Sequence, residues 1–315
     1  MSRLTLSLAC HASDRTRPLL DGRVTIPGVD LVPLVGEPED IFRRALRDRA
    51  FDITELSMGS HIVTTARGDS AYIGVPVFPS RAFRHSAIYI RTDRGIASAA
   101  DLAGRTIGLP EYQQTAALWV RGILREHYGV DTRGIAWRIG AERIAITVPP
   151  GLDVQPLGRD PALALAEGAI DALIAPRPPS GPGIARLYPD YKAEEIAWHR
   201  ATGFFPIMHC VALRRELAER HPWLPVEIFR AFTRARDIAL GELQLVNVLR
   251  ASLPWIAAAY EEQAAIMGGD PWPYGFARNR EEVAAMIRFA VADGLATEAI
   301  PPEALFHSGT LAEVA

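Results

Sequence analysis

Residues 51–78 read FDITELSMGSHIVTTARGDSAYIGVPVF, and the order of apolar runs within them indicates the architecture of the chain. Residues 51–56 form a short apolar run typical of a buried strand, and residues 71–78 form a second one. Between them, residues 57–66 have the length and spacing of a helix. Strands that alternate with helices at this spacing predict an α/β fold, in which a mostly parallel sheet carries helices on both faces.

The same alternation extends on both sides of this segment. The other expected strands are residues 3–9, 31–35, 105–109, 135–139, 144–148, 169–175 and 204–213, and the other expected helices are residues 38–49, 115–128, 162–167, 225–240 and 279–293. Residues 176–183, PRPPSGPG, hold too many prolines and glycines for regular structure. A second unit begins near residue 91, and the strand at 204–213 returns to the first unit. We therefore expect a first lobe of residues 1–91 and 205–315, a second lobe of residues 92–204 inserted into it, and a ligand cleft between them.

Composition narrows the class of partner. The 315 residues suffice for about two domains, and 49% apolar with 23% charged residues is typical of a globular protein. No segment approaches the roughly 18 apolar residues of a membrane span. The net charge is −3, and the basic side chains are scattered, which argues against a nucleic-acid groove. The expected partner is a small molecule, and association into a homo-oligomer is left open.

The few lysines and cysteines argue against Schiff-base chemistry and against C-x-x-C metal or redox sites. Lys192 is the only lysine and lies in a polar stretch, which disfavours Schiff-base chemistry. Cys10 and Cys210 lie in no C-x-x-C pattern and can form at most one disulfide. Residues 4–10 are too short and too interrupted by polar side chains for an export signal, so we interpret them as strand. We expect a cytoplasmic protein with reduced cysteines.

Eight segments are specific enough to indicate a family. They are VFPSRAFRHS (77–86), DLAG (101–104), EYQQTA (111–116), WVRG (119–122), YGV (128–130), TGFFPIMH (202–209), PW (222–223) and DPWPYG (270–275). Together they resemble the 4,5-dihydroxyphthalate decarboxylases over nearly the whole chain, and the Phe-Arg-His and Trp-Pro-Tyr-Gly segments are the most particular. One departure is GAER at 140–143, where the family pattern predicts a second glycine in the lining of the cleft.

The resemblance implies both a fold and a reaction. The fold is a two-lobed clamshell like that of the type II periplasmic binding proteins. The reaction is cofactor-independent decarboxylation of a hydroxylated aromatic diacid, with 4,5-dihydroxyphthalate giving 3,4-dihydroxybenzoate and carbon dioxide as the expected case. The alternative is a non-catalytic solute-binding protein for an aromatic or other small carboxylate.

The candidate site residues follow the ends of the expected strands, where ligands of α/β folds bind. Glu55, His85 and His209 are the candidates for proton transfer. The candidates for substrate binding are His11, Ser57, Ser80, Arg81, Arg84, Tyr112, Gln113 and Thr115.

Two segments suit anionic groups. Arg81 and Arg84 can each hold a carboxylate through two parallel hydrogen bonds. They cannot both face the same way in an extended segment, so one of them can be structural. Residues 111–115 open the expected helix at 115–128, whose first N–H groups can bind an anion, although Thr115 can equally serve as an ordinary cap.

Imidazole titrates near neutral pH, which makes histidine the first candidate for moving a proton. We expect His85 to be the proton donor, with Glu55 as its partner, and we keep His209 as the second candidate. A histidine in an apolar strand is as often a core residue. His61 can face the cleft, and His127, His221 and His307 lie among charged or terminal residues typical of the surface.

Metal and nucleotide cofactors are not expected. Glu55, His61 and His85 are ligand types for a divalent metal, but the chain has no H-x-H, H-x-x-x-H or H-E-x-x-H spacing. It also has neither a G-x-G-x-x-G nor a G-x-x-x-x-G-K-[ST] motif. We predict a metal-free site with no cofactor.

Overall fold

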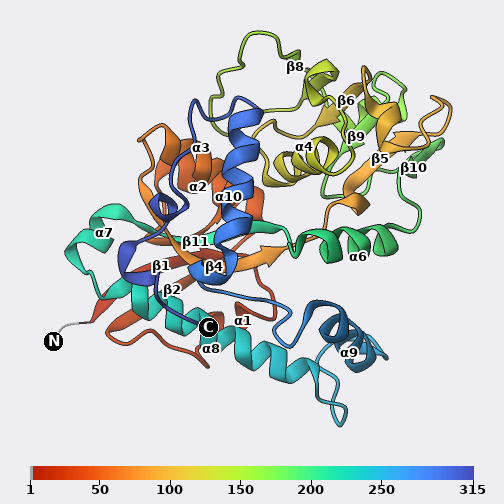
Figure 1. Cartoon of the computed structure of the whole chain (residues 1–315). Helices are drawn as coiled ribbons and strands as arrows, with labels where there is room; N and C mark the ends of the chain where they lie inside the picture. The colour runs from red at the N-terminus through yellow and green to blue at the C-terminus, as the bar shows by residue number, and fades with distance from the viewer. Residues whose placement is uncertain (1–2) are drawn as a thin grey trace.

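The computed structural model describes residues 3–315 and shows two sheets with helices around each (Figure 1). The first sheet has the order β2-β1-β3-β11-β4. Its strands are β1 (Leu4–Cys10), β2 (Val29–Val35), β3 (Ile53–Ser57), β4 (Tyr72–Arg81) and β11 (Ile207–Arg214). Strand β1 runs parallel to β2 and β3, whereas β11 runs antiparallel to β3 and β4, between which it lies. The chain thus leaves this sheet after β4 and returns to its interior as β11.

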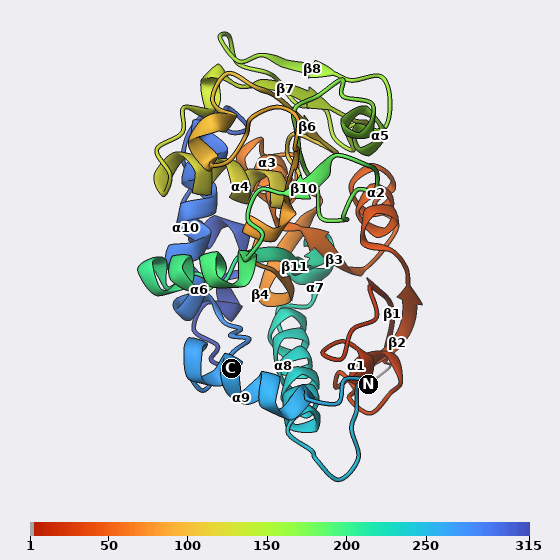
Figure 2. The same ribbon diagram turned by 90° about the vertical axis from the view of Figure 1, so that its right-hand side faces the viewer.

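The second sheet is built from the intervening part of the chain, which lies above the first sheet in Figure 2, and it has the order β10-β5-β9-β6-β7-β8. Its strands are β5 (Ile88–Arg91), β6 (Thr106–Leu109), β7 (Ala136–Ile139), β8 (Val154–Pro156), β9 (Ala172–Ile174) and β10 (Ile184–Arg186). Strands β9, β6, β7 and β8 are parallel, and β5 is antiparallel to both its neighbours. An interrupted first lobe is what the sequence predicts.

The first lobe boundary needs a correction. Residues 88–91 were assigned to the first lobe, but they form β5 and pair with β9 and β10 of the second sheet. The chain therefore crosses from the first lobe to the second in residues 82–87, because the apolar run that begins at Ile88 belongs to the second sheet. The return crossing lies in residues 203–206, between α6 and β11.

Ten α-helices surround the sheets in residues 3–315. They are α1 (Arg17–Leu20), α2 (Pro38–Asp48), α3 (Met58–Ala66), α4 (Thr115–Glu126), α5 (Pro161–Ala166), α6 (Tyr191–Thr202), α7 (Arg215–Arg220), α8 (Leu224–Leu243), α9 (Ile256–Met267) and α10 (Phe276–Ala292). Helices α2 and α3 follow the sequence prediction to within a residue or two. Helix α6 had no counterpart in it, because its polar sequence lacks a clear apolar stripe. Helix α9 lies in the part of the chain after residue 217 whose pattern is mainly helical, but its bounds were not predicted.

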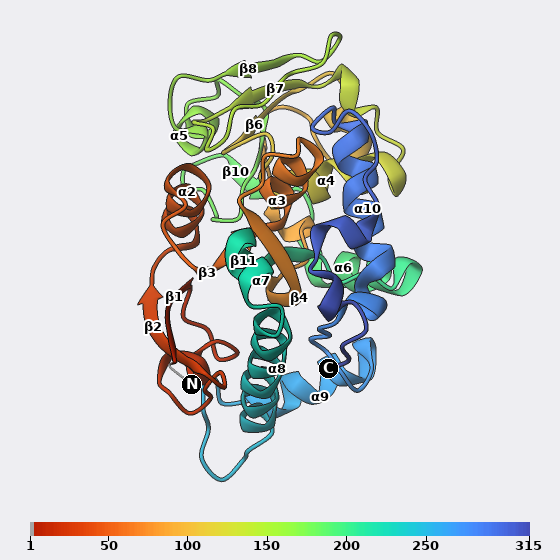
Figure 3. The ribbon, with the colours of Figure 1, turned by 90° about the vertical axis from the view of Figure 1, so that its left-hand side faces the viewer.

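Helix α10 connects the two lobes. It follows the second crossing in the chain, and Figure 3 shows it running beside α3 of the first lobe and α4 of the second. Gly122 allows the close approach of α4, because a Cβ at that position would collide with the ring of Phe289 on α10. The carboxylate of Asp293 then holds Arg121 at 2.6 Å and Arg125 at 2.9 Å, both on α4. One apolar core cluster includes residues of both lobes.

Two other expectations concern segments of the second lobe. The strand predicted at 144–148 is absent: residues 140–153 form a loop, and the edge of β7 is taken by β8 instead. Pro149 and Pro150, which lack N–H donors, follow directly and disfavour a ladder there. Residues 176–183 form turns and bends, as predicted.

Three smaller predictions can be compared with the described residues. Lys192 is exposed and pairs with Glu262 on α9 at 2.7 Å. Cys10 and Cys210 are both buried free thiols. None of the helices within residues 3–315 combines the length and the apolar character that crossing a bilayer requires.

Candidate active site

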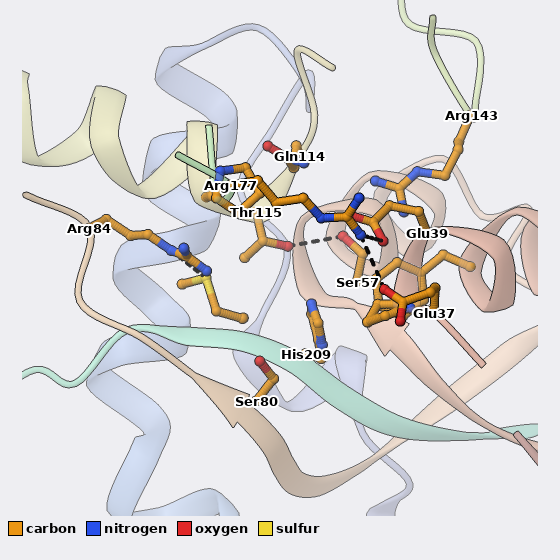
Figure 4. Close-up of a pocket in the computed structure, with 15 residues that line it drawn as sticks. Glu37, Glu39, Ser57, Ser80, Arg84, Gln114, Thr115, Arg143, Arg177 and His209 are labelled. Carbon is orange, nitrogen blue, oxygen red and sulfur yellow. Dashed lines mark hydrogen bonds and ion pairs between the residues drawn. The ribbon is translucent and has the colours of Figure 1, made fainter. Parts of the chain in front are cut away.

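A cavity of about 260 Å³ lies between the two lobes. Its volume is near the lower end of the range that is usual for small-molecule binding sites. Figure 4 shows side chains from both lobes around it. The first lobe and the crossing segment contribute Glu37, Pro38, Glu39, Phe42, Ser57, Ser80, Arg84, Met208 and His209. The second lobe contributes Gln114, Thr115, Ala116, Arg143, Pro176 and Arg177.

A buried carboxylate that is shared by two imidazoles lies next to His209 of the cavity lining. Glu55 on β3 is fully buried, and its Oε1 lies 2.5 Å from Nδ1 of His209 on the adjacent strand β11. Its Oε2 lies 2.6 Å from Nδ1 of His11 and accepts the backbone N–H of the same residue at 3.0 Å. The pairing of β3 with β11 brings Glu55 and His209 together, and the end of β1 supplies His11.

The surroundings of Glu55 decide its charge. Burial by itself raises the pKa of a carboxyl group, but the charge of His209 and the hydrogen bonds from His11 and His209 outweigh burial and lower the pKa of Glu55 to about 2. An ionised carboxylate has no proton to give, so Nδ1 of each imidazole must donate. The second ring nitrogen of His209, Nε2, is therefore the atom available to a ligand, and Figure 4 shows this ring rising into the cavity.

The N-termini of two helices meet at one wall. Ser57, the N-cap of α3, lies 2.9 Å from the hydroxyl of Thr115, the first residue of α4. Thr115 also accepts the N–H of Gly59, and a Cβ at Gly59 would collide with the carbonyl of Gln113. The backbone N–H groups of Thr115 and Ala116 have no acceptor among the described residues. They offer the start of α4 to an anion in the cavity.

Arg84 supplies a positive charge on the opposite side. Its Nε donates to the sulfur of Met208 at 3.0 Å, and no carboxylate of residues 3–315 forms an ion pair with it. Burial lowers the pKa of Arg84 to about 10, an effect that the charge of Glu195 opposes, so the guanidinium stays protonated at neutral pH. A half-buried cation with free terminal nitrogens is suited to a ligand carboxylate.

Two further arginines of the second lobe line the cavity and already have partners. Arg143 pairs with Glu111 at 2.7 Å and lies 5.2 Å from the ring of Phe42. Arg177 is 72% exposed and pairs with Glu37 at 3.1 Å and Glu39 at 3.4 Å (Figure 4). The pairs of Arg177 and the contact of Arg143 with Phe42 connect the second lobe with α2 of the first lobe and its cap residue Glu37.

The structure brings together Glu55, His209, Ser57, Ser80, Arg84 and Thr115 of the predicted set, with His11 directly behind Glu55. It places Arg81 elsewhere: its guanidinium is buried and donates to the carbonyls of Phe205 and Pro273 and to Asn279 and Glu282. Arg81 thus fixes the crossing segments to α10 and is not a ligand clamp. As expected for an extended segment, only one of the two arginines faces the cavity.

Tyr112 and Gln113 also lie outside the cavity. Tyr112 is buried, its hydroxyl donates to the carbonyl of Asp293 at 3.2 Å, and its ring packs on the guanidinium of Arg121. Gln113 is buried and donates to Glu111. Both residues support the turn before α4, so the anion site consists of the helix start itself and its cap residue Gln114.

His85 requires the largest correction. It does not line the cavity, and its ring is buried among Tyr128, Tyr188 and Trp198 at centroid distances of 5.5–5.9 Å. Burial lowers its pKa to about 4, with a smaller effect from His127. The expected partnership of Glu55 with His85 is wrong, because both carboxylate oxygens are taken by other histidines. His61 likewise faces away from the cleft, toward the carbonyl of Leu305 at 2.8 Å.

His11, Glu55 and His209 offer atoms that lie within 4.8 Å of one another, a spacing from which a metal site can be built. Their N···O distances of 2.5 and 2.6 Å, however, are those of direct hydrogen bonds. Two ligand atoms about 2.0–2.2 Å from a tetrahedral zinc ion would lie roughly 3.3 Å apart. His11, Glu55 and His209 thus form a hydrogen-bonded triad of residue types that can also hold a divalent metal, whereas Glu55, His61 and His85 do not converge.

Sequence reasoning missed Glu37, Glu39, Gln114, Arg143, Arg177 and Met208. A signal existed for the two arginines. Arg143 and Arg177 each follow a strand that the sequence predicts, β7 and β9, and residues after strand ends are the ones that reach a cleft. The two glutamates open α2, where acidic residues are also ordinary for a helix start, so sequence alone does not single them out.

The chain is 44% identical over 325 aligned positions to a 4,5-dihydroxyphthalate decarboxylase of Comamonas testosteroni, covering 99% of this chain and 98% of the relative. The chain belongs to the 4,5-dihydroxyphthalate decarboxylase family. A second member of this family, from Pseudomonas putida, is 45% identical over 218 positions, covering 65% of this chain and 84% of the relative. No family model matches the chain. The family predicted from the sequence segments is confirmed.

Solved structures support the fold of this decarboxylase family member. The aliphatic sulphonate binding protein SsuA of Escherichia coli aligns over 99% of this chain and all of its own, with a TM-score of 0.53 and 14% identity. SsuA from Xanthomonas axonopodis, bound to MOPS, covers 97% of this chain and 99% of its own, with a TM-score of 0.53 and 15% identity. The predicted periplasmic-binding-protein-like fold is confirmed.

Proposed function

We propose that this protein is a carbon–carbon lyase that converts 4,5-dihydroxyphthalate to 3,4-dihydroxybenzoate and carbon dioxide in the cytoplasm, without an organic cofactor. The observation that carries the proposal is the 44% identity to a 4,5-dihydroxyphthalate decarboxylase over almost the full length of both chains. The cavity supports it, because it combines an unpaired arginine, a helix start and a histidine backed by a carboxylate.

The substrate is a planar ring with two adjacent carboxylates on one side and two hydroxyls on the other. Arg84 and the N–H groups at the start of α4 suit the carboxylate side, since both favour anions and lie in the same cavity. In this placement the carbon that loses its carboxylate lies near Nε2 of His209. Ser57 and Ser80 offer hydroxyl groups to the same region.

The ring itself supplies the electrons for the reaction. Each carboxylate-bearing carbon has a hydroxyl group para to it, and electrons pushed from that oxygen make the carbon basic. His209 gives its Nε2 proton to this carbon, forming a C–H bond and a dienone-like intermediate. The C–C bond to the carboxylate then breaks, carbon dioxide leaves, and the electron pair restores the aromatic ring. One proton is consumed per turnover, and His209 recovers it from solvent.

Glu55 makes His209 suitable for this step. Because the carboxylate is ionised, it fixes the proton on Nδ1 and stabilises the imidazolium form that donates from Nε2. Arg84 holds the ligand during the step, so that the reacting carbon stays within reach of the proton.

A carboxylate-binding protein without turnover is the second candidate, because the solved neighbours with this fold include sulphonate-binding proteins. One experiment separates the two. The purified protein is incubated with 4,5-dihydroxyphthalate and a panel of hydroxylated phthalates and benzoates, and carbon dioxide release is followed with and without a chelator. Release that resists the chelator is expected; tight binding of the diacid with no release would establish the binding protein instead.

A further inference from the structure

The sequence suggests His11 as a substrate ligand, but the structure pairs its ring with Glu55 and leaves it out of the cavity lining. His11 is absent from the cavity lining, whereas its partner His209 is part of it. Both contacts that His11 makes with Glu55 end on Oε2, one from the ring and one from the backbone. The hydrogen bonds that connect His11 with the site residues therefore all end on the carboxylate.

We propose that His11 is a positioning residue, which holds Oε2 of Glu55 so that Oε1 fixes the tautomer and the orientation of His209 during proton transfer. This role rests on the proposed function, since it concerns the same histidine. In this role His11 acts on Glu55 and does not bind the substrate.

The geometry supports a positioning role in two ways. Glu55 is fully buried, while His11 is 22% and His209 17% exposed, so the two imidazoles are the groups that separate the carboxylate from solvent. With both oxygens held, the carboxylate cannot rotate, and the ring of His209 is further fixed by the edge of Phe42 at a centroid distance of 4.7 Å.

The electrostatics around Glu55 support the same role. Besides the two histidines, the buried thiols of Cys10 and Cys210 lie near Glu55, and both are neutral because burial and the charge of Glu55 raise their pKa values well above the usual range. Within residues 3–315, Glu55 forms ion pairs with these two histidines and with no other cation. Losing the hydrogen bond from His11 leaves burial less opposed, and burial favours the protonated carboxyl group.

Two amide substitutions of His11 test the proposal as a matched pair. In His11→Asn the amide nitrogen occupies nearly the position of Nδ1 and can still donate to Glu55. In His11→Gln the same amide lies further out, at the position of Nε2, and cannot. Both variants are neutral and polar, so they differ mainly in where the donor sits.

The expected result is a separation of kcat from KM. His11→Asn keeps kcat within about threefold of the wild type, whereas His11→Gln lowers kcat at least tenfold and leaves KM within about threefold. The acid limb of the kcat profile moves to higher pH by about one unit or more in His11→Gln only, because Glu55 takes up a proton more readily. A merely structural role would not move this limb.

Three outcomes would overturn the proposal. Equal kinetics of the two variants would show that the donor position does not matter. A higher KM in His11→Gln with an unchanged kcat and acid limb would make His11 a substrate ligand. A stoichiometric divalent metal in the purified protein, lost in both variants, would make the triad a metal site.

A measurement that does not depend on turnover distinguishes this proposal from the proposed function. Two downfield imidazole N–H proton signals are expected in the NMR spectrum of the wild type, one for each short bond to Glu55, with one lost in His11→Gln. Their absence in the folded wild type would reject the triad even if carbon dioxide is released. Their presence without release would reject the proposed reaction and leave the arrangement of His11 intact.

Discussion

Arg84 and Arg81 are three residues apart and have opposite surroundings. Arg84 has free terminal nitrogens in the cavity, whereas those of Arg81 are hydrogen-bonded to the crossing segments and α10. We expect Arg84→Ala to weaken phthalate binding by about 2–4 kcal/mol, because a buried carboxylate loses its cation. Arg84→Lys should restore part of the affinity. Calorimetric titration with phthalate measures both.

Arg81→Ala serves as the contrasting variant. It should lower the unfolding free energy, because Glu282 loses its buried partner. The phthalate affinity of the folded fraction should stay near that of the wild type. If Arg81→Ala weakened binding while Arg84→Ala did not, the assignment of the carboxylate site to Arg84 would be wrong.

His209 and His85 can be compared in the same way. His209→Gln removes the proton donor, so carbon dioxide release should fall by about 10²–10⁴-fold while phthalate still binds. His85→Gln should keep turnover close to that of the wild type, because its ring lies in the aromatic cluster outside the cavity. Loss of turnover in a folded His85→Gln variant, with His209→Gln active, would return proton transfer to His85.

The sequence indicates which residue types are near the cleft, but not which of them meet. It predicts that Arg81 and Arg84 diverge, since an extended segment alternates its side chains. It cannot predict that Glu55 meets His209, because this depends on the register between β3 and β11, which are separated by about 150 residues of chain. His85 looked equally suitable because it follows β4, and only the packing against α6 shows that it is covered.

At the level of elements, three ion pairs join α4 with the α10 region, two of them on Asp293, and they differ in burial. Asp293 holds the fully buried Arg121, whereas Glu126 and Arg288 form an exposed pair at 2.8 Å. We expect Asp293→Ala to lower the unfolding free energy by about 3–5 kcal/mol, because Arg121 keeps an unpaired buried charge. Urea denaturation measures the change.

Glu126→Gln is the matched control. It removes the exposed pair between the same two helices and should cost about 0–1 kcal/mol, since solvent already screens these charges. Equal losses in Asp293→Ala and Glu126→Gln would contradict the view that the buried pair holds α10 against α4.

Elements with a clear pattern were predicted well, and the others were not. Helix α2 has a strong apolar face and begins at a proline, so its ends were predicted closely. Helix α9 has no buried residue, and without a buried face there is no periodicity to detect. The false strand at 144–148 shows the opposite error, in which apolar residues of a loop that packs on the core imitate a strand.

For the whole molecule, burial of histidines makes stability depend on pH. Burial lowers the pKa of His61 and of His85 from 6.5 to about 4. Between these values the unfolded chain binds protons that the folded chain does not, so the unfolding free energy falls as the pH falls from about 6.5 to 4. Glu55, with its pKa lowered from 4.5 to about 2, adds a further loss as the pH falls below 4.5.

His85→Phe tests the first part of this dependence. An aromatic ring should fit among Tyr128, Tyr188 and Trp198 and does not titrate. The difference in unfolding free energy between pH 7 and pH 5, measured by urea denaturation, should therefore be smaller in His85→Phe than in the wild type. An unchanged difference would mean that His85 does not stay neutral in the folded protein.

Helix α10 has a consequence for how the molecule behaves in solution. Binding proteins with this fold respond to a ligand by a hinge motion of their lobes, and that change of shape is what a transporter can sense. Here α10 is fixed to the first lobe through Arg81 and Glu282 and to the second through Asp293 and Arg121. We expect the radius of gyration from small-angle scattering to stay the same when phthalate is added. A protein with such fixed lobes has the same outer shape whether its cavity is filled or empty, so a partner protein could not sense the bound ligand. An enzyme that releases its product at every turnover does not need such sensing.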